Sequence, residues 1–198
     1  MRSPEYRKDV RQAMLTLGRE SIAHGLDTGL PLTLSDPAPA GELAESRASF
    51  VTLRQAGELR GCMGSLEAMS PLAESVARNA FQSAFEDPRF RPLPSSALNT
   101  LDIEISVLSA LESMTIHSEA ELLRELEPLV DGLVLDAGPY RSTFLPKVWE
   151  QLRDPQEFLY ALKRKAGLPG EYWSHDIRVY RYQTETFAES DYQHDLQS

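Results

Sequence analysis

The sequence has a single cysteine among 198 residues, which excludes an internal disulfide and suits a reducing compartment. It also lacks the run of about 20 apolar residues that spans a bilayer. The first ten residues, MRSPEYRKDV, lack the apolar core of a signal peptide. We therefore expect a soluble, cytoplasmic protein that does not enter a membrane.

Basic residues are scarce as well. Lys and Arg together number 20 against 30 Asp and Glu, so the formal net charge is −10. Proteins that bind nucleic acid normally carry a basic patch that displaces counterions. The acidic balance therefore argues against nucleic acid and anionic lipid as partners.

The common cofactor motifs are missing. There is no HExxH and no CxxC for a metal, and no GxGxxG or GxxxxGK[ST] for a nucleotide. The four histidines have no spacing that links them to the cysteine, and they lie at His24, His117, His175 and His194. We predict no metal site and assign no cofactor.

The apolar pattern predicts an α+β fold, and 198 residues are enough for one domain with a sizeable core or for two small lobes. Expected helices run from Ser3 and Pro4 to Gly25 and over 70–88, 118–126 and 154–167. Expected strands cover 49–54, 59–66, 101–108 and 177–187, and residues 131–145 form a second hairpin. Because strands and helices do not alternate regularly, we expect mixed or antiparallel sheets with flanking helices. The polar tail, 189–198, is expected to fray.

The cysteine lies in the segment LRGCMGSLEA, residues 59–68. On a strand, Arg60 and Cys62 share one face about 7 Å apart. A guanidinium near a thiol stabilises the thiolate, and Gly61 and Gly64 remove side chains from the surroundings. We interpret this segment as a place for a small anionic ligand, held by Arg60 beside a reactive Cys62. The structural alternatives are a cysteine that only packs and glycines that only mark a bulge.

Two further candidates lie near this segment. In EDPRF, residues 86–90, Asp87, Arg89 and Phe90 could clamp a ligand, or the segment could simply end a helix with locally paired charges. Glu67 is a candidate general acid or base if it is buried beside the cysteine. A solvated glutamate is the alternative.

The order of several sequence blocks resembles the AMMECR family. These blocks are FVTLRQAGELRGCMGSLEA, DPRF, ISVLS, FLPKVWE, EFLYALKRKAGLP and YRYQTETFAE, and the similarity runs from about residue 12 to 189. Prokaryotic members are called AmmeMemoRadiSam system protein A. The resemblance implies a single AMMECR domain over residues 1–198, with a larger lobe from the N- and C-terminal regions, a smaller inserted lobe, and a cleft between them. It also implies that the cleft is bordered by family positions that here are Leu59, Arg60, Gly61, Cys62, Gly64, Ser65, Asp87, Arg89 and Phe90.

The family has no established reaction, so two functions stay open. The first is a cleft-based enzyme or enzyme subunit, with Cys62 and Glu67 as catalytic candidates. The second is a non-catalytic adaptor that works with a Memo-like protein and a radical-SAM protein, the partners that the system name implies. With one cysteine, the chain cannot itself hold a radical-SAM cluster. Two residues depart from the family pattern: Met63 replaces isoleucine, and Asp131 replaces a histidine that could have served as a base.

Overall fold

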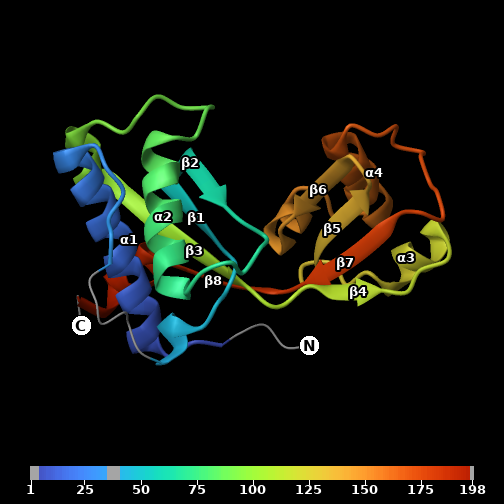
Figure 1. Cartoon of the computed structure of the whole chain (residues 1–198), viewed down its shortest axis with the longest axis horizontal. Coiled ribbons are helices and arrows are strands. Elements are labelled where there is room, and N and C mark those ends of the chain that lie inside the picture. The colour runs from blue at the N-terminus through green and yellow to red at the C-terminus, as the bar shows by residue number, and fades with distance from the viewer. Residues whose placement is uncertain (1–4, 35–40, 197–198) are drawn as a thin grey trace. The chain divides into compact units, whose positions relative to one another are not determined.

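A computed structural model describes residues 5–34 and 41–196. The described chain divides into two compact units (Figure 1). Residues 5–108 and 185–196 form one unit, here called the N/C lobe, and residues 109–184 form the other, the inserted lobe.

The N/C lobe is built on a four-stranded sheet. Its strands are β1 (Ser49–Gln55), β2 (Glu58–Gly64), β3 (Leu101–Leu108) and β8 (Thr184–Ala188), in the order β2-β1-β3-β8. Strand β1 is antiparallel to both of its neighbours. The turn between β1 and β2 has positive φ at Ala56 and Gly57, 52° and 83°, as a tight hairpin requires. In this strand order, β2 is the first strand and lies at an open edge of the sheet.

Two helices, α1 (Lys8–Thr28) and α2 (Leu72–Phe85), pack together on one face of this sheet (Figure 1). The alternation of apolar residues in β1 and β3 directs every second side chain toward the helices. The resulting core is fully buried, and its members include Val51, Leu53, Ile103 and Ile105 from the strands and Met14, Ile22 and Val76 from the helices.

Helix α1 differs from the expected one at both ends. It begins at Lys8, and the expected cap at Ser3 and Pro4 lies outside the described residues. Gly25 does not end the helix, because the left-handed cap is Gly29, with φ of 73°. A Cβ at Gly25 would lie closer than 3.0 Å to the ring of Phe85, so this glycine permits the close contact between α1 and α2.

The inserted lobe has its own antiparallel sheet. Its strands are β4 (Glu112–Met114), β5 (Gly132–Ala137), β6 (Tyr140–Phe144) and β7 (Arg178–Tyr182), in the order β4-β7-β5-β6. Helices α3 (Glu119–Glu125) and α4 (Pro155–Ala166) complete this lobe. In its core the Trp149 and Phe158 rings stack with centroids 3.8 Å apart.

The helix caps of this lobe confirm the sequence prediction. The Ser118 hydroxyl accepts a hydrogen bond from the Glu121 N–H. The Asp154 carboxylate accepts from the N–H groups of Gln156 and Glu157, which starts α4. Gly167, with φ of 90°, ends α4 as expected.

The described residues also form four short 3₁₀ helices: η1 (Gly41–Ala44), η2 (Ser95–Thr100), η3 (Pro146–Glu150) and η4 (Glu189–Leu196). The last one lies in the polar tail 189–198, whose fraying stays a prediction. Arg19 of α1 donates two hydrogen bonds, 2.7 and 2.6 Å long, to the Glu189 carboxylate. The start of η4 is thereby fixed to α1, and residues 197–198 lie outside the described residues.

The stretch 177–187, expected to be one strand, is divided. Its first part is β7 in the sheet of the inserted lobe, and its second part is β8 in the sheet of the N/C lobe. The α+β class with antiparallel sheets and flanking helices is confirmed, and the cleft between the lobes stays a prediction. Among the described residues no helix has the length and apolar character needed to cross a membrane.

Candidate functional site at the edge of strand β2

Gly61, the first glycine of the segment 59–68, faces helix α2. Gly61 is buried opposite Leu53 in the β1–β2 ladder. A Cβ at Gly61 would lie closer than 3.0 Å to the carbonyl oxygen of Ser83, a backbone atom of α2. The missing side chain therefore allows the helix to approach the strand.

The second glycine is also explained by packing. A Cβ at Gly64 would collide with the ring of Phe50 and with the Ser49 carbonyl oxygen of β1. The expectation that the two glycines leave an opening for a ligand is wrong at these positions, because the protein itself fills the space. The ligand-binding role of Gly61 and Gly64 stays a prediction without that support.

Three small polar residues of α2 hold the hairpin at this close distance. Ser75, Asn79 and Ser83 are buried and follow each other at intervals of four residues. The Ser83 hydroxyl accepts from the Met63 N–H at 2.8 Å and donates to the Val51 carbonyl at 2.7 Å. It thus links β1 and β2 through the helix.

Asn79 and Ser75 continue this contact along α2. The Asn79 amide donates to the Ser49 carbonyl at 2.9 Å, and the hydroxyls of Ser49 and Ser75 lie 2.8 Å apart. Sequence reasoning missed this seam. The sequence signal for these contacts is the four-residue spacing of small polar residues on the buried face of α2.

The backbone of Cys62 is held from outside the sheet by the segment that follows α2. The Cys62 N–H donates to Asp87 Oδ2 at 2.8 Å, and its carbonyl accepts from Arg89 Nη2 at 3.2 Å. Asp87 and Arg89 thus occupy the hydrogen-bonding groups that an additional strand would take. This arrangement protects the open edge of the sheet.

Asp87 and Arg89 also bind each other. The carboxylate accepts from Arg89 Nε at 2.9 Å and from Nη2 at 2.7 Å. Only 2% of the Asp87 side chain is exposed, against 55% of Arg89. The Arg89 guanidinium, helped by the Cys62 N–H and opposed by burial, holds the pKa of Asp87 well below its ordinary value. The local charge pair expected in EDPRF is thus observed, and the ligand clamp of Asp87, Arg89 and Phe90 stays a prediction.

The thiol of Cys62 is half-buried, and the Thr52 hydroxyl donates to its sulfur at 3.4 Å. The guanidinium bonded to this residue belongs to Arg89, through the carbonyl oxygen, whereas we expected Arg60. None of the hydrogen bonds to Cys62 within the described residues comes from a histidine. Within the described residues, the hydrogen bonds of Cys62 therefore supply no histidine as a base for the thiol.

Arg60 and Arg89 flank one aromatic ring. Their guanidinium carbons lie 5.9 and 5.5 Å from the centroid of Phe90. Arg60 Nη2 donates to the Arg91 carbonyl at 2.7 Å, while Nη1 is buried and has no partner. Arg60 forms no ion pair with a carboxylate of the described residues, so it is the uncompensated cation of this site.

The two remaining candidates lie just after β2. Glu67 is exposed and not buried beside the cysteine, and its N–H donates to the Ser65 hydroxyl at 3.0 Å. Ser65 N–H in turn donates to the Ser49 carbonyl at 3.2 Å. Ser65 therefore stabilises the turn that leaves the strand, and the catalytic role of Glu67 stays a prediction.

The fold and this site define a two-lobed α+β protein with a clamped RGC strand. Residues 15–187 match the AMMECR1 family, and the chain belongs to that family. A protein of Methanothermobacter thermautotrophicus is 34% identical over 92% of this chain and 95% of its own length. A protein of Methanopyrus kandleri is 33% identical over 90% of this chain and 87% of its own.

A solved structure agrees with the fold. The crystal structure of an uncharacterised protein from Pyrococcus horikoshii is similar with a TM-score of 0.85 and 33% sequence identity. The match covers 92% of this chain and 93% of that chain. The names of these relatives state no activity, so the comparisons establish family and fold.

Proposed function

We propose that this protein binds a small anionic molecule at the outer edge of β2, with Arg60 as the cationic contact. The observation that carries this proposal is that, among the described residues, Arg60 has no counter-ion and its Nη1 has no hydrogen-bond partner. An unmet buried donor costs about 1–3 kcal/mol. A carboxylate or phosphate group would satisfy it, since the guanidinium fork matches both. The half-buried side chain has to turn Nη1 outward to reach such a group.

The other residues of the site support Arg60. Asp87 and Arg89 hold the Cys62 backbone and so fix the strand from which Arg60 projects. Both guanidinium groups lie over the ring of Phe90. This arrangement favours binding over catalysis, because a nucleophilic thiol normally requires an adjacent base.

An amide titration by nuclear magnetic resonance tests the anion site. Inorganic phosphate and acetate are added to the full chain at constant ionic strength. We expect saturable shifts at the amides around Arg60, Cys62 and Phe90, and at least a tenfold weaker affinity in Arg60→Gln. Arg54→Gln is the matched control, since Arg54 lies in the same hairpin and also donates to a backbone carbonyl, that of Gly57 at 3.4 Å. Equal affinity in the two variants, or shifts without saturation, would contradict the proposal.

The enzymatic version of this function depends on the thiol. The half-exposed position of Cys62 and its hydrogen bond from Thr52 are the observations in its favour. A catalytic Cys62 is expected to react with iodoacetamide at pH values well below the ordinary thiol pKa of about 8.5. A slow reaction, together with unchanged cellular function in Cys62→Ser, would favour the adaptor.

The adaptor version assigns this protein to the AmmeMemoRadiSam system in the cytoplasm. It would then deliver or present the anion to a Memo-like protein or a radical-SAM protein, as the family resemblance implies. Co-purification of each partner with the wild type and with Arg60→Gln tests this version. Loss of a partner in Arg60→Gln, but not in Arg54→Gln, is the expected result. If neither partner co-purifies with the wild type, the adaptor version is contradicted.

A further inference from the structure

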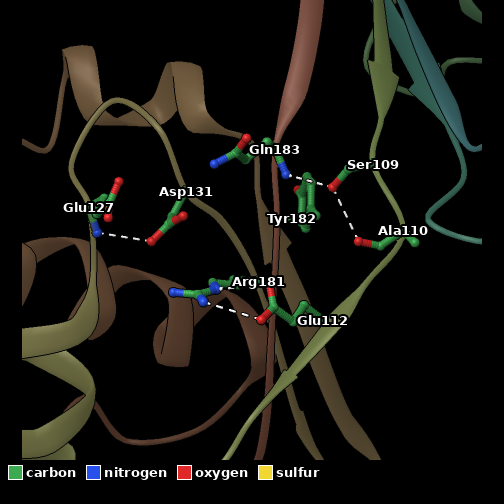
Figure 2. Close-up of a pocket in the computed structure, with 8 residues that line it drawn as sticks. All are labelled: Ser109, Ala110, Glu112, Glu127, Asp131, Arg181, Tyr182 and Gln183. Atoms are coloured by element: carbon green, nitrogen blue, oxygen red, sulfur yellow. Dashed lines mark hydrogen bonds and ion pairs between the residues drawn. The ribbon is translucent and has the colours of Figure 1, made fainter. Parts of the chain in front are cut away.

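The inserted lobe contains a small cavity that none of the sequence predictions covered. Its volume is about 90 Å³, which is room for several water-sized groups. Figure 2 shows its polar walls, which come from β4, from β7 and from the segment between α3 and β5. The side chains used below are those of Glu112, Glu127, Asp131, Arg181 and Gln183.

Asp131 is the buried group of this cavity. Only 2% of the residue is exposed. Its Oδ2 accepts from the Glu127 N–H at 2.9 Å, and its own carbonyl accepts from Trp149 Nε1 at 2.7 Å. The carboxylate is thereby held in one position, and Figure 2 shows it turned toward the space bounded by Glu127, Arg181 and Gln183.

The other carboxylate oxygen, Oδ1, has no hydrogen-bond partner among the described residues. No cationic nitrogen of those residues lies within ion-pair distance of Asp131. Burial raises the pKa of the Asp131 carboxyl above its ordinary value, and the Glu127 N–H opposes this in part. A carboxylate in this state is costly to keep unpaired.

The cation that lines the cavity, Arg181, is already paired with a carboxylate. Arg181 Nε and Nη2 donate to the two oxygens of Glu112, each at 3.2 Å. This pair is neutral as a unit, so Asp131 and the exposed Glu127 leave the cavity with uncompensated negative charge. The side-chain amide of Gln183 also makes no hydrogen bond to another described residue, and it can accept or donate.

We propose that this cavity binds the ammonium group of a small organic amine, with Asp131 Oδ1 as the principal acceptor. An ammonium group has three N–H donors, and the available acceptors are Asp131, the Gln183 amide oxygen and Glu127. A charge-assisted hydrogen bond of this kind is about twice as strong as a neutral one. The site lies within the inserted lobe and does not depend on the anion site of the N/C lobe.

Titration with ethanolammonium chloride tests the proposal, with methylammonium as the minimal probe. Tetramethylammonium has the same charge but no N–H donor, and all samples have equal ionic strength. The readout is the set of backbone amide shifts around Asp131 and Gln183 in the full chain. We expect saturation in the millimolar range, because a probe of two to four heavy atoms cannot bind more tightly than its size allows.

Asp131→Asn is the decisive variant, because it preserves the acceptor for the Glu127 N–H while it removes the charge. Asp136→Asn is the matched control, since Asp136 lies on β5 and pairs with Arg178 at 3.4 Å. We expect at least a tenfold loss of ethanolammonium affinity in the first variant and no change in the second. Asp131→Asn should also melt at the same or a higher temperature without amine, since it removes an unpaired buried charge. Loss of binding with intact stability therefore separates the site from a folding defect.

Four results would overturn the proposal: no saturable shift in the wild type, equal affinity for tetramethylammonium, unchanged affinity in Asp131→Asn, or tighter binding of Mg²⁺ or Ca²⁺ at the same amides. The comparison of probes uses the wild type alone. It therefore decides the question even if Asp131→Asn fails to fold.

Discussion

The substitution Gly61→Ala separates packing from ligand access at the RGC strand. A methyl group added at this position would collide with the Ser83 carbonyl oxygen, which belongs to the backbone of α2 and cannot rotate away. Helix α2 would have to move away from the sheet. We therefore expect a large loss of stability, although the change adds only one carbon atom.

The magnitude follows from two costs. Overpacking a close contact costs about 1–3 kcal/mol, and a backbone partner places this case at the upper end. Moving α2 also weakens the two hydrogen bonds of the Ser83 hydroxyl, each worth about 1 kcal/mol. We expect Gly61→Ala to lower the free energy of unfolding by about 3–5 kcal/mol, a large part of the 5–15 kcal/mol typical of a protein.

Urea unfolding followed by far-ultraviolet circular dichroism is the suitable assay. Both tryptophans, Trp149 and Trp173, lie in the inserted lobe, so their fluorescence would miss an effect confined to the N/C lobe. Gly18→Ala in α1 is the control, because its nearest neighbour, a methyl of Ile103, would lie at an ordinary 3.7 Å. Alanine is favoured over glycine within a helix, so this variant should gain about 0.5–1 kcal/mol. A loss below about 1 kcal/mol in Gly61→Ala would refute the reasoning and restore an opening beside the strand.

Two further predictions concern buried charges. Asp87→Asn is expected to cost about 2–3 kcal/mol near pH 7, because the exposure of Arg89 limits the strength of the pair. Folding lowers the Asp87 pKa, so the stabilisation by this carboxylate is present above its unfolded pKa of about 4 and is lost as the pH falls toward the lower pKa of the folded state. Urea titrations at several pH values measure this loss. A stability difference between Asp87→Asn and wild type that stays the same in acid would contradict the prediction. Lys163→Met in α4 is expected to cost about 1–3 kcal/mol by the same assay. The fully buried Lys163 Nζ donates to the Gly170 carbonyl at 3.0 Å and pairs with Glu119 Oε2 at 2.8 Å, and methionine leaves both oxygens without this partner. An unchanged midpoint in Lys163→Met would show that the apolar stem alone stabilises this position.

The elements with local signals were predictable from the sequence. Strand β3 alternates apolar and polar residues over its whole length, and it was expected at the residues where it lies. Ser118 and Asp154 start their helices because their side chains accept bonds from nearby N–H groups. Such signals depend only on residues a few positions apart.

The elements that depend on distant contacts were not predictable in the same way. The stretch 177–187 has one continuous strand pattern, and its division into β7 and β8 is set by the two sheets that it joins. Gly25 resembles a helix end, but it is retained inside α1 by the rings of Phe81 and Phe85. The partners that decide these cases are 40 or more residues away in the chain.

The candidate site shows the same limit. The sequence indicated that Arg60 and Cys62 matter together, but it could not show which group meets the cysteine. The structure brings Arg89 to the Cys62 carbonyl and leaves Arg60 with Phe90. The glycines, interpreted as space for a ligand, are required by α2 and β1.

The charges that remain unpaired carry more information than those that are paired. Several buried or half-buried charges are matched within the protein, as in the pairs Asp87–Arg89, Arg19–Glu189 and Lys163–Glu119. Arg60 and Asp131 differ from these pairs: Arg60 Nη1 has no hydrogen-bond partner among the described residues, and Asp131 is a buried carboxyl whose pKa is raised by burial. Proteins usually tolerate such local costs where a ligand relieves them. Because the two groups have opposite charge, an anion and an amine are expected at separate sites, and each titration should leave the amides of the other site unshifted.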